Sequence, residues 1–92
     1  MKFIKVNNFW FSGVYKIVEY QYFKNDKTNP YYQVYYLVGG QANWGDRVNS
    51  ENKNNCGLTF QQCVELAKEH RISNLVTHSQ IMQAKRVVEA LK

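Results

Sequence analysis

The sequence predicts a single α+β domain over residues 1–92, in which an antiparallel sheet of three or four strands precedes two helices packed on one face. The first observation is that β-branched and aromatic residues dominate residues 14–23 and 31–38, as is typical of strands. The second is that apolar residues recur with a period of about 3.6 in the last third of the chain. An apolar fraction of 45% in 92 residues suits one core.

One hairpin is expected to form most of the sheet. Residues 14–23 and 31–38 are its strands, and the polar segment 24–30, which holds the only Pro, is its loop. A short strand over residues 2–6 precedes the hairpin, and residues 44–48 are a candidate for a fourth strand. The strands therefore all come before the helices.

Alternation within residues 31–38 separates the two faces of the second strand, because successive side chains point to opposite sides of a sheet. The more apolar set, expected to face the helices, is Tyr32, Val34, Tyr36 and Val38. The set expected to face away from the helices is Tyr31, Gln33, Tyr35 and Leu37. In the first strand the alternation is ambiguous, because Lys16 falls in one set and Glu19 in the other.

Two capping boxes mark the starts of the helices. In residues 59–62 and 77–80 a Thr is followed three positions later by a Gln, so that the Thr hydroxyl accepts from a backbone N–H and the Gln reaches back. Apolar residues then share one face of each helix. They are Phe60, Cys63, Val64 and Ala67 in the first helix, and Ile81, Ala84, Val88 and Leu91 in the second.

Charge and cysteine content narrow the class of protein. The net charge of +5 favours an acidic partner, such as nucleic acid or a ribonucleoprotein, although a solvated surface carries such a charge equally well. No secretory leader and no apolar run of about 20 residues is present, so a cytoplasmic protein without a membrane association is expected. Cys56 and Cys63 make no disulfide framework, which fits a reducing compartment.

No catalytic or metal-binding constellation stands out, and no cofactor or small-molecule substrate is expected. Cys56, Cys63, His70 and His78 lack the closely spaced Cys pair of structural zinc sites. Cys63 suits a small apolar core position. Cys56 precedes a helix N-terminus, which stabilises a thiolate, but nothing places a base beside it. The chain is therefore not expected to be an enzyme. A small enzyme that uses Cys56 as its nucleophile is kept as a further hypothesis.

The tyrosines give the strongest indication of function. Besides Tyr15, the two long strands carry Tyr20, Tyr22, Tyr31, Tyr32, Tyr35 and Tyr36. A small domain buries one face of a hairpin well, so some of these rings are expected on an outer surface, where Tyr is a favoured binding residue. Such rings beside lysines suit base stacking and phosphate contacts, and equally a protein–protein hot spot. The structural interpretation is that they only cover a small twisted sheet.

The candidate binding residues are two tyrosines expected on the outer face and a set of basic residues. They are Lys24, Lys27, Tyr31, Tyr35, Arg47, Lys85 and Arg86. Arg and Lys would contact phosphates, and the tyrosines would supply desolvated anchors. These residues predict a non-enzymatic binding protein.

A compact, Asn- and Tyr-rich single domain with no catalytic signature and no targeting signal is similar to small phage-encoded inhibitors of the anti-CRISPR type. The resemblance implies a protein of the host-cell cytoplasm that occupies a bacterial protein or ribonucleoprotein complex and blocks target DNA binding. Because it lies in overall character, it assigns no role to single residues. Residues 11–18 also look like a strand of some phage tail and baseplate proteins. The alternatives are thus a phage structural or assembly subunit and a small nucleic-acid-binding domain.

Overall fold

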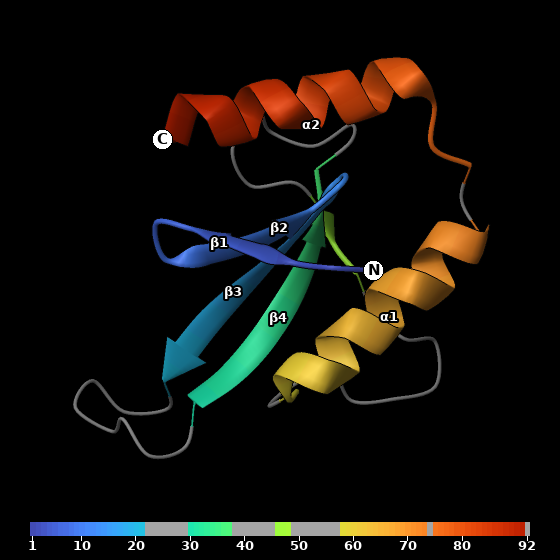
Figure 1. The fold of residues 1–92 in the computed structure, drawn as a ribbon. Coiled ribbons are helices and arrows are strands. Elements are labelled where there is room, and N and C mark those ends of the chain that lie inside the picture. The colour runs from blue at the N-terminus through green and yellow to red at the C-terminus, as the bar shows by residue number, and fades with distance from the viewer. Residues whose placement is uncertain (22–29, 38–45, 49–57, 74, 92) are drawn as a thin grey trace.

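The computed structural model of the protein describes residues 1–21, 30–37, 46–48, 58–73 and 75–91 (Figure 1). The elements are β1 (Ile4–Val6), β2 (Phe9–Ser12), β3 (Tyr15–Gln21), β4 (Pro30–Tyr36), β5 (Asp46–Arg47), α1 (Phe60–Ser73) and α2 (His78–Leu91). The strands form one antiparallel sheet in the order β1-β2-β3-β4-β5. Four strands have three to seven residues and β5 has two. The α+β class, with a sheet followed by two helices, is confirmed.

The strand connections follow local sequence signals. Asn7, in the turn between β1 and β2, has a φ of 56°, and Asn tolerates this left-handed conformation better than most residues. Gly13, in the turn between β2 and β3, has a φ of 57°, where glycine carries no steric penalty. Pro30, expected in the hairpin loop, is instead the first residue of β4, a strand position that Pro tolerates.

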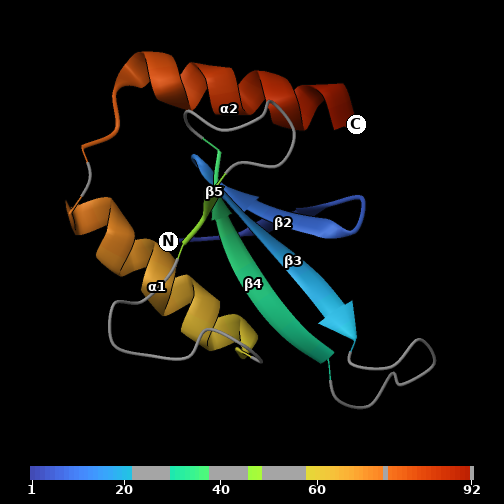
Figure 2. The same cartoon turned by 180° about the vertical axis from the view of Figure 1, so that it is seen from behind.

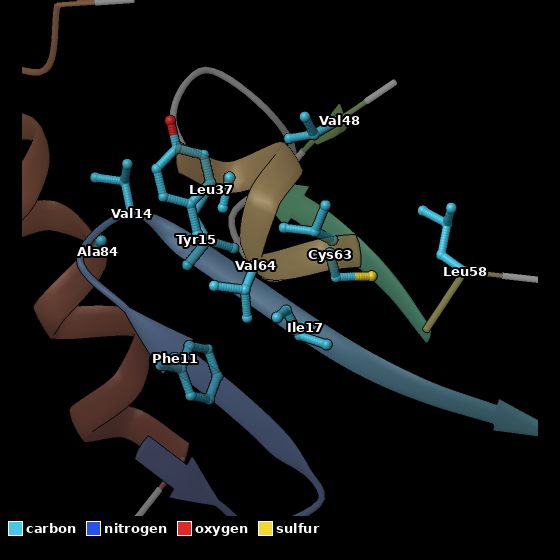
Figure 3. Close-up of a cluster of buried hydrophobic side chains, with 12 residues drawn as sticks. Phe11, Val14, Tyr15, Ile17, Leu37, Val48, Leu58, Cys63, Val64 and Ala84 are labelled. Atoms are coloured by element: carbon cyan, nitrogen blue, oxygen red, sulfur yellow. The ribbon is translucent and has the colours of Figure 1, made fainter. Parts of the chain in front are cut away.

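Helix α1 covers one face of the sheet, called here the α1 face. Register pairs Ile17 with Val34 and Tyr15 with Tyr36, and these side chains form the core with the buried face of α1. Figure 3 shows Cys63 and Val64 of α1 beside Ile17. The inward orientation predicted for Tyr32, Val34 and Tyr36 is therefore confirmed, and the fourth member of that set, Val38, lies outside the described residues.

Helix α2 lies across the β1–β2 hairpin, away from α1 (Figures 1 and 2). Its buried Ala84 belongs to the same core cluster as Val14 and Phe11, and Figure 3 shows these residues beside α2. Phe11 alternates with Trp10, so it points to the sheet face opposite α1. Helix α1 therefore packs on one face of the sheet, as predicted, whereas α2 packs on the side of Phe11.

One expectation about the side chains that face away from the helices is wrong for Leu37. The alternation within its strand predicted that it would point to solvent, yet its side chain is only 6% exposed. Its backbone N–H donates to the carbonyl of Val14 at 2.8 Å, at the end of the sheet that α2 covers. Packing at this end therefore buries both faces of the sheet.

Both predicted capping boxes are present. The Gln62 N–H donates to the Thr59 hydroxyl at 3.1 Å, and the Gln62 side chain accepts from the Thr59 N–H at 2.8 Å. The Thr77–Gln80 pair repeats this geometry at 3.2 and 2.9 Å. Each box satisfies helix-terminal N–H groups and fixes the first turn of its helix. Within the described ranges, neither helix is long and apolar enough to cross a bilayer.

Candidate functional site

Three tyrosines gather on the sheet face opposite α1. They are Tyr20 of β3 and Tyr31 and Tyr35 of β4, called here the tyrosine cluster. Register places Tyr20 directly opposite Tyr31, and their rings stack with centroids 5.4 Å apart at 20°. The hydroxyls of Tyr20 and Tyr35 share a hydrogen bond of 2.7 Å. Stacking and this bond together fix the relative positions of the three rings.

Lys16 lies beneath the tyrosine cluster. It pairs with Tyr35 across β3 and β4, and its side chain is only 3% exposed. Its Nζ lies 5.3 Å from the ring centroid of Tyr35 and 5.2 Å from that of Phe9. Aromatic faces attract cations at such distances, which offsets part of the cost of burying the ammonium. Burial lowers the pKa of Lys16.

The tyrosine cluster is neither core nor fully exposed surface, because Tyr20, Tyr31 and Tyr35 are all half-buried. Each of the three residues therefore packs partly against its neighbours and keeps part of its surface exposed. Tyr residues in this position combine apolar contact area with hydrogen bonding, a combination that is enriched at interfaces. The tyrosine cluster is therefore a partly exposed aromatic surface on one sheet face.

The structure brings only some of the predicted binding residues together. Tyr31 and Tyr35 lie in the tyrosine cluster, and the backbone of Arg47 pairs with that of Tyr35. Lys85 and Arg86 are exposed on α2. Tyr31 is the second residue of β4, a strand that begins at the end of the sheet away from α2 (Figure 1). The remaining two, Lys24 and Lys27, lie outside the described residues.

The sequence did not assign Tyr20 and Lys16 to a face of the sheet, so neither was among the candidate binding residues. The ambiguous alternation of the first strand hid the face to which each belongs. The signal that resolves it is the register between β3 and β4, which sets Lys16 opposite Tyr35 and Tyr20 opposite Tyr31. Register depends on the loop geometry between the strands, which composition alone does not fix.

A second aromatic group surrounds His70 on the α1 face. The Nδ1 atom of His70 forms a 2.7 Å hydrogen bond with the Tyr15 hydroxyl, and its ring lies 4.6 Å from that of Tyr36. Burial lowers the pKa of His70 and is the main cause that raises the pKa of Tyr15 to about 12. Both shifts favour neutral side chains, and the hydrogen bond and ring contacts tie α1 to the sheet.

Cys63 is a core residue, as its place on the first helix suggested. It is 0% exposed, and burial raises the pKa of its thiol to about 12. A thiol held neutral and away from solvent is a poor nucleophile. Among the described residues, no three His, Cys, Asp or Glu side chains gather to hold a metal ion. Cys56, the candidate nucleophile, lies outside those residues.

A polar cleft of about 290 Å³ opens on the α1 face, lined by Lys5, Asn8, Trp10 and Glu19. We call it the tryptophan cleft. Lys5 Nζ lies 5.1 Å from the Trp10 ring centroid. The Tyr32 hydroxyl donates a long hydrogen bond of 3.3 Å to Oε2 of Glu19. The cleft thus presents a cation, a carboxylate, an amide and an indole within one concave surface.

The chain was compared with known protein families, sequences and structures. No protein-family model, curated protein sequence or solved structure matches this chain.

Proposed function

We propose that the protein is a non-enzymatic binding protein that inhibits a bacterial nucleoprotein complex by occupying its surface through the tyrosine cluster. The concrete form of this proposal is an anti-CRISPR protein that blocks the binding of target DNA. The observation that carries it is a group of three half-buried tyrosine rings, fixed by stacking and by a hydroxyl–hydroxyl bond on one sheet face.

Preorganisation supports a binding role for the tyrosine cluster. A side chain that is already fixed loses little conformational freedom when a partner binds, and this loss is a main cost of association. Tyr31 is held by stacking on Tyr20, and Tyr35 is held through its hydroxyl bond to the same residue. Tyrosines also supply large contact areas with few rotatable bonds. The cluster can therefore anchor a partner at low entropic cost.

Charge supports an acidic partner. The chain carries a net charge of +5, which favours approach to the phosphates of guide RNA or target DNA. Lys24 and Lys27 belong to the sequence segment that joins β3 to β4, directly after Gln21. Arg47 lies in register with Tyr35. The tyrosines would anchor the interface while these basic side chains contact phosphates.

A pull-down from bacterial lysate with tagged protein tests this proposal, carried out with and without nuclease. Recovery of a defined nucleoprotein complex is expected for the wild type, and much less for Tyr31→Ala, which removes one of the stacked rings. Tyr31→Phe keeps the stacking ring, and Gln61→Ala changes an exposed side chain on α1, so both are expected to retain the complex. Equal recovery by Tyr31→Ala and the wild type would contradict the role of the cluster.

The anti-CRISPR form has its own functional test. In a bacterium whose CRISPR immunity targets a phage, expression of the protein should raise the plating efficiency of that phage. Tyr31→Ala, checked for folding by circular dichroism, should lose this effect, whereas Gln61→Ala should keep it. Unchanged immunity in cells that contain the folded wild-type protein, across the CRISPR types tested, would count against inhibition of those complexes.

A second candidate, a phage structural or assembly subunit, is favoured by two exposed apolar residues at the connection between the helices. Ile72 is 85% exposed and Leu75 is 96% exposed. A second copy that covers these two side chains would remove their apolar surface from water. This candidate predicts a concentration-dependent oligomer in sedimentation velocity, which Leu75→Ser should dissociate. A monomer at all concentrations would exclude it.

A further inference from the structure

The tryptophan cleft is a separate site that does not depend on the tyrosine cluster, because the two lie on opposite faces of the sheet. Register pairs Lys5 with Trp10 across β1 and β2, and Trp10 with Ile17 across β2 and β3. Glu19 alternates with Ile17 on the same face, and Asn8 lies in the adjacent turn. Four different functional groups therefore meet on one face at one end of the sheet.

Trp10 is positioned as a stacking platform. Its ring makes edge contacts with Phe60 at 5.4 Å and with Tyr32 at 6.0 Å, at 69° and 74°. These contacts hold the indole from two sides, and the residue is half-buried. The Lys5 ammonium lies over one face of the indole, so this face is open to a group from outside the core. A base of any kind can stack on such a fixed ring, because every base has a planar π-face.

The two charges in the cleft specify complementary groups on a ligand. Exposed Glu19 accepts one long bond from Tyr32 through Oε2, and a carboxylate has about four acceptor positions in total. It can therefore accept two adjacent N–H donors. Exposed Lys5 suits an anion such as a phosphate. A planar ligand with two neighbouring donors and a phosphate would satisfy both charges.

We propose that the tryptophan cleft binds a guanine nucleotide, with the base stacked on Trp10, its two adjacent donors on Glu19 and its phosphate on Lys5. Guanine alone among the common bases offers N1–H and the N2 amino group side by side. Adenine places an acceptor nitrogen at the equivalent edge, which a carboxylate repels. Asn8 offers an amide that can donate to the O6 acceptor of guanine.

The size of the cleft and the exposure of Lys5 fit this ligand. A volume of about 290 Å³ is at the lower end of small-molecule pockets, which suits one nucleotide and leaves any further strand outside. When the base stacks, the Lys5 ammonium moves from the indole face to the phosphate. A cation–π contact at an exposed site is weaker than base stacking on an aromatic ring, so this exchange favours the bound state.

Binding is tested by isothermal titration of the protein with GMP and AMP. GMP is expected to bind about tenfold or more tightly than AMP, as one bidentate base contact provides. Glu19→Gln, an exposed substitution that replaces one acceptor by a donor, should abolish this preference. Glu65→Gln, which removes an exposed carboxylate on α1, should leave it unchanged. Equal affinity for both nucleotides, or an unchanged preference in Glu19→Gln, would overturn the proposal.

A second readout follows the stacking ring directly. GMP should quench tryptophan fluorescence in the wild type, and the quenching should be lost in Trp10→Phe, which leaves Trp44 as the only Trp. Lys5→Gln should weaken GMP binding but leave guanosine binding unchanged, because only the former has a phosphate. Quenching that persists in Trp10→Phe, or equal losses for GMP and guanosine in Lys5→Gln, would contradict the assigned contacts.

The source of the nucleotide is distinguished by comparing GMP with single strands that contain one guanine or one adenine among thymines. Tighter binding of the guanine strand than of GMP identifies single-stranded nucleic acid as the source, and the reverse order identifies a free nucleotide. Loss of the guanine preference in both forms overturns the proposal. These measurements use no nucleoprotein partner, so their failure is distinguishable from failure of the pull-down.

Discussion

Replacing Ile17 by Ala tests the assignment of the core to the α1 face. Ile17 is 0% exposed at the centre of the sheet, between Trp10 of β2 and Val34 of β4. Truncation removes buried methyl and methylene groups and leaves a cavity between the sheet and α1. The matched control is Ile72→Ala, the same substitution at a side chain that is 85% exposed on α1.

The structure sets the expected magnitudes. A buried Ile→Ala substitution costs about 2–5 kcal/mol through lost transfer free energy and the cavity. A domain of this size has a free energy of unfolding of roughly 5–15 kcal/mol, so this loss is a large fraction of the total. It corresponds to a fall in Tm of at least about 8 °C. At Ile72 almost no buried apolar area is lost, and Ala favours the helix. The free energy of unfolding should therefore change by no more than about 0.5 kcal/mol.

Thermal and urea denaturation followed by circular dichroism measure both variants against the wild type. Ile17→Val, expected to cost about 0.5–1.5 kcal/mol, provides an intermediate point. The order should be Ile72→Ala, Ile17→Val and Ile17→Ala, from least to most destabilised. Similar losses for the two alanine variants would refute the placement of Ile17 in the core and of Ile72 at the surface.

Three further predictions concern local features. Thr59→Ala removes the hydroxyl that caps α1 and should cost about 1 kcal/mol in urea denaturation, whereas Thr59→Ser should cost much less. His70 has a lowered pKa, so the folded state favours its neutral form; stability should be intact above about pH 6.5 and decline as pH falls below it. This decline should be smaller in His70→Gln but unchanged in His78→Gln; an equal decline in all three proteins would rule out His70 as its cause. In a Cys56→Ser protein, Cys63 should react with a thiol reagent only as fast as the protein unfolds, and rapid reaction under native conditions would contradict its burial.

Local patterns in the sequence predicted much of the fold. The Thr59–Gln62 and Thr77–Gln80 boxes each involve four consecutive residues, and the hydrogen bonds they predict are formed. The alternation in the second long strand correctly placed Tyr32, Val34 and Tyr36 toward a helix. In these cases the deciding interaction is between residues close in sequence or set by the two-residue period of a strand.

Features that depend on long-range packing were not accessible in this way. The apolar stripe of α2 indicates that one side of the helix is buried, but not which face of the sheet buries it. The burial of Leu37 follows from that same choice. The position of Lys16 under the tyrosine cluster requires the register of β3 against β4, and the tryptophan cleft requires three strands to align. Single-strand patterns contain no information on such alignments.

The two outer strands of the sheet restrict how a partner can engage this protein. β1 has three residues and β5 has two, so each edge offers few backbone groups for pairing with an added strand. Short edges of this kind protect sheets from edge-to-edge aggregation. Among the described residues, β-augmentation at β1 or β5, in which a peptide extends the sheet, would be limited to these few backbone groups. Binding to the faces of the sheet or to the helices would depend on side-chain chemistry, so its specificity would change by point substitution without altering the backbone.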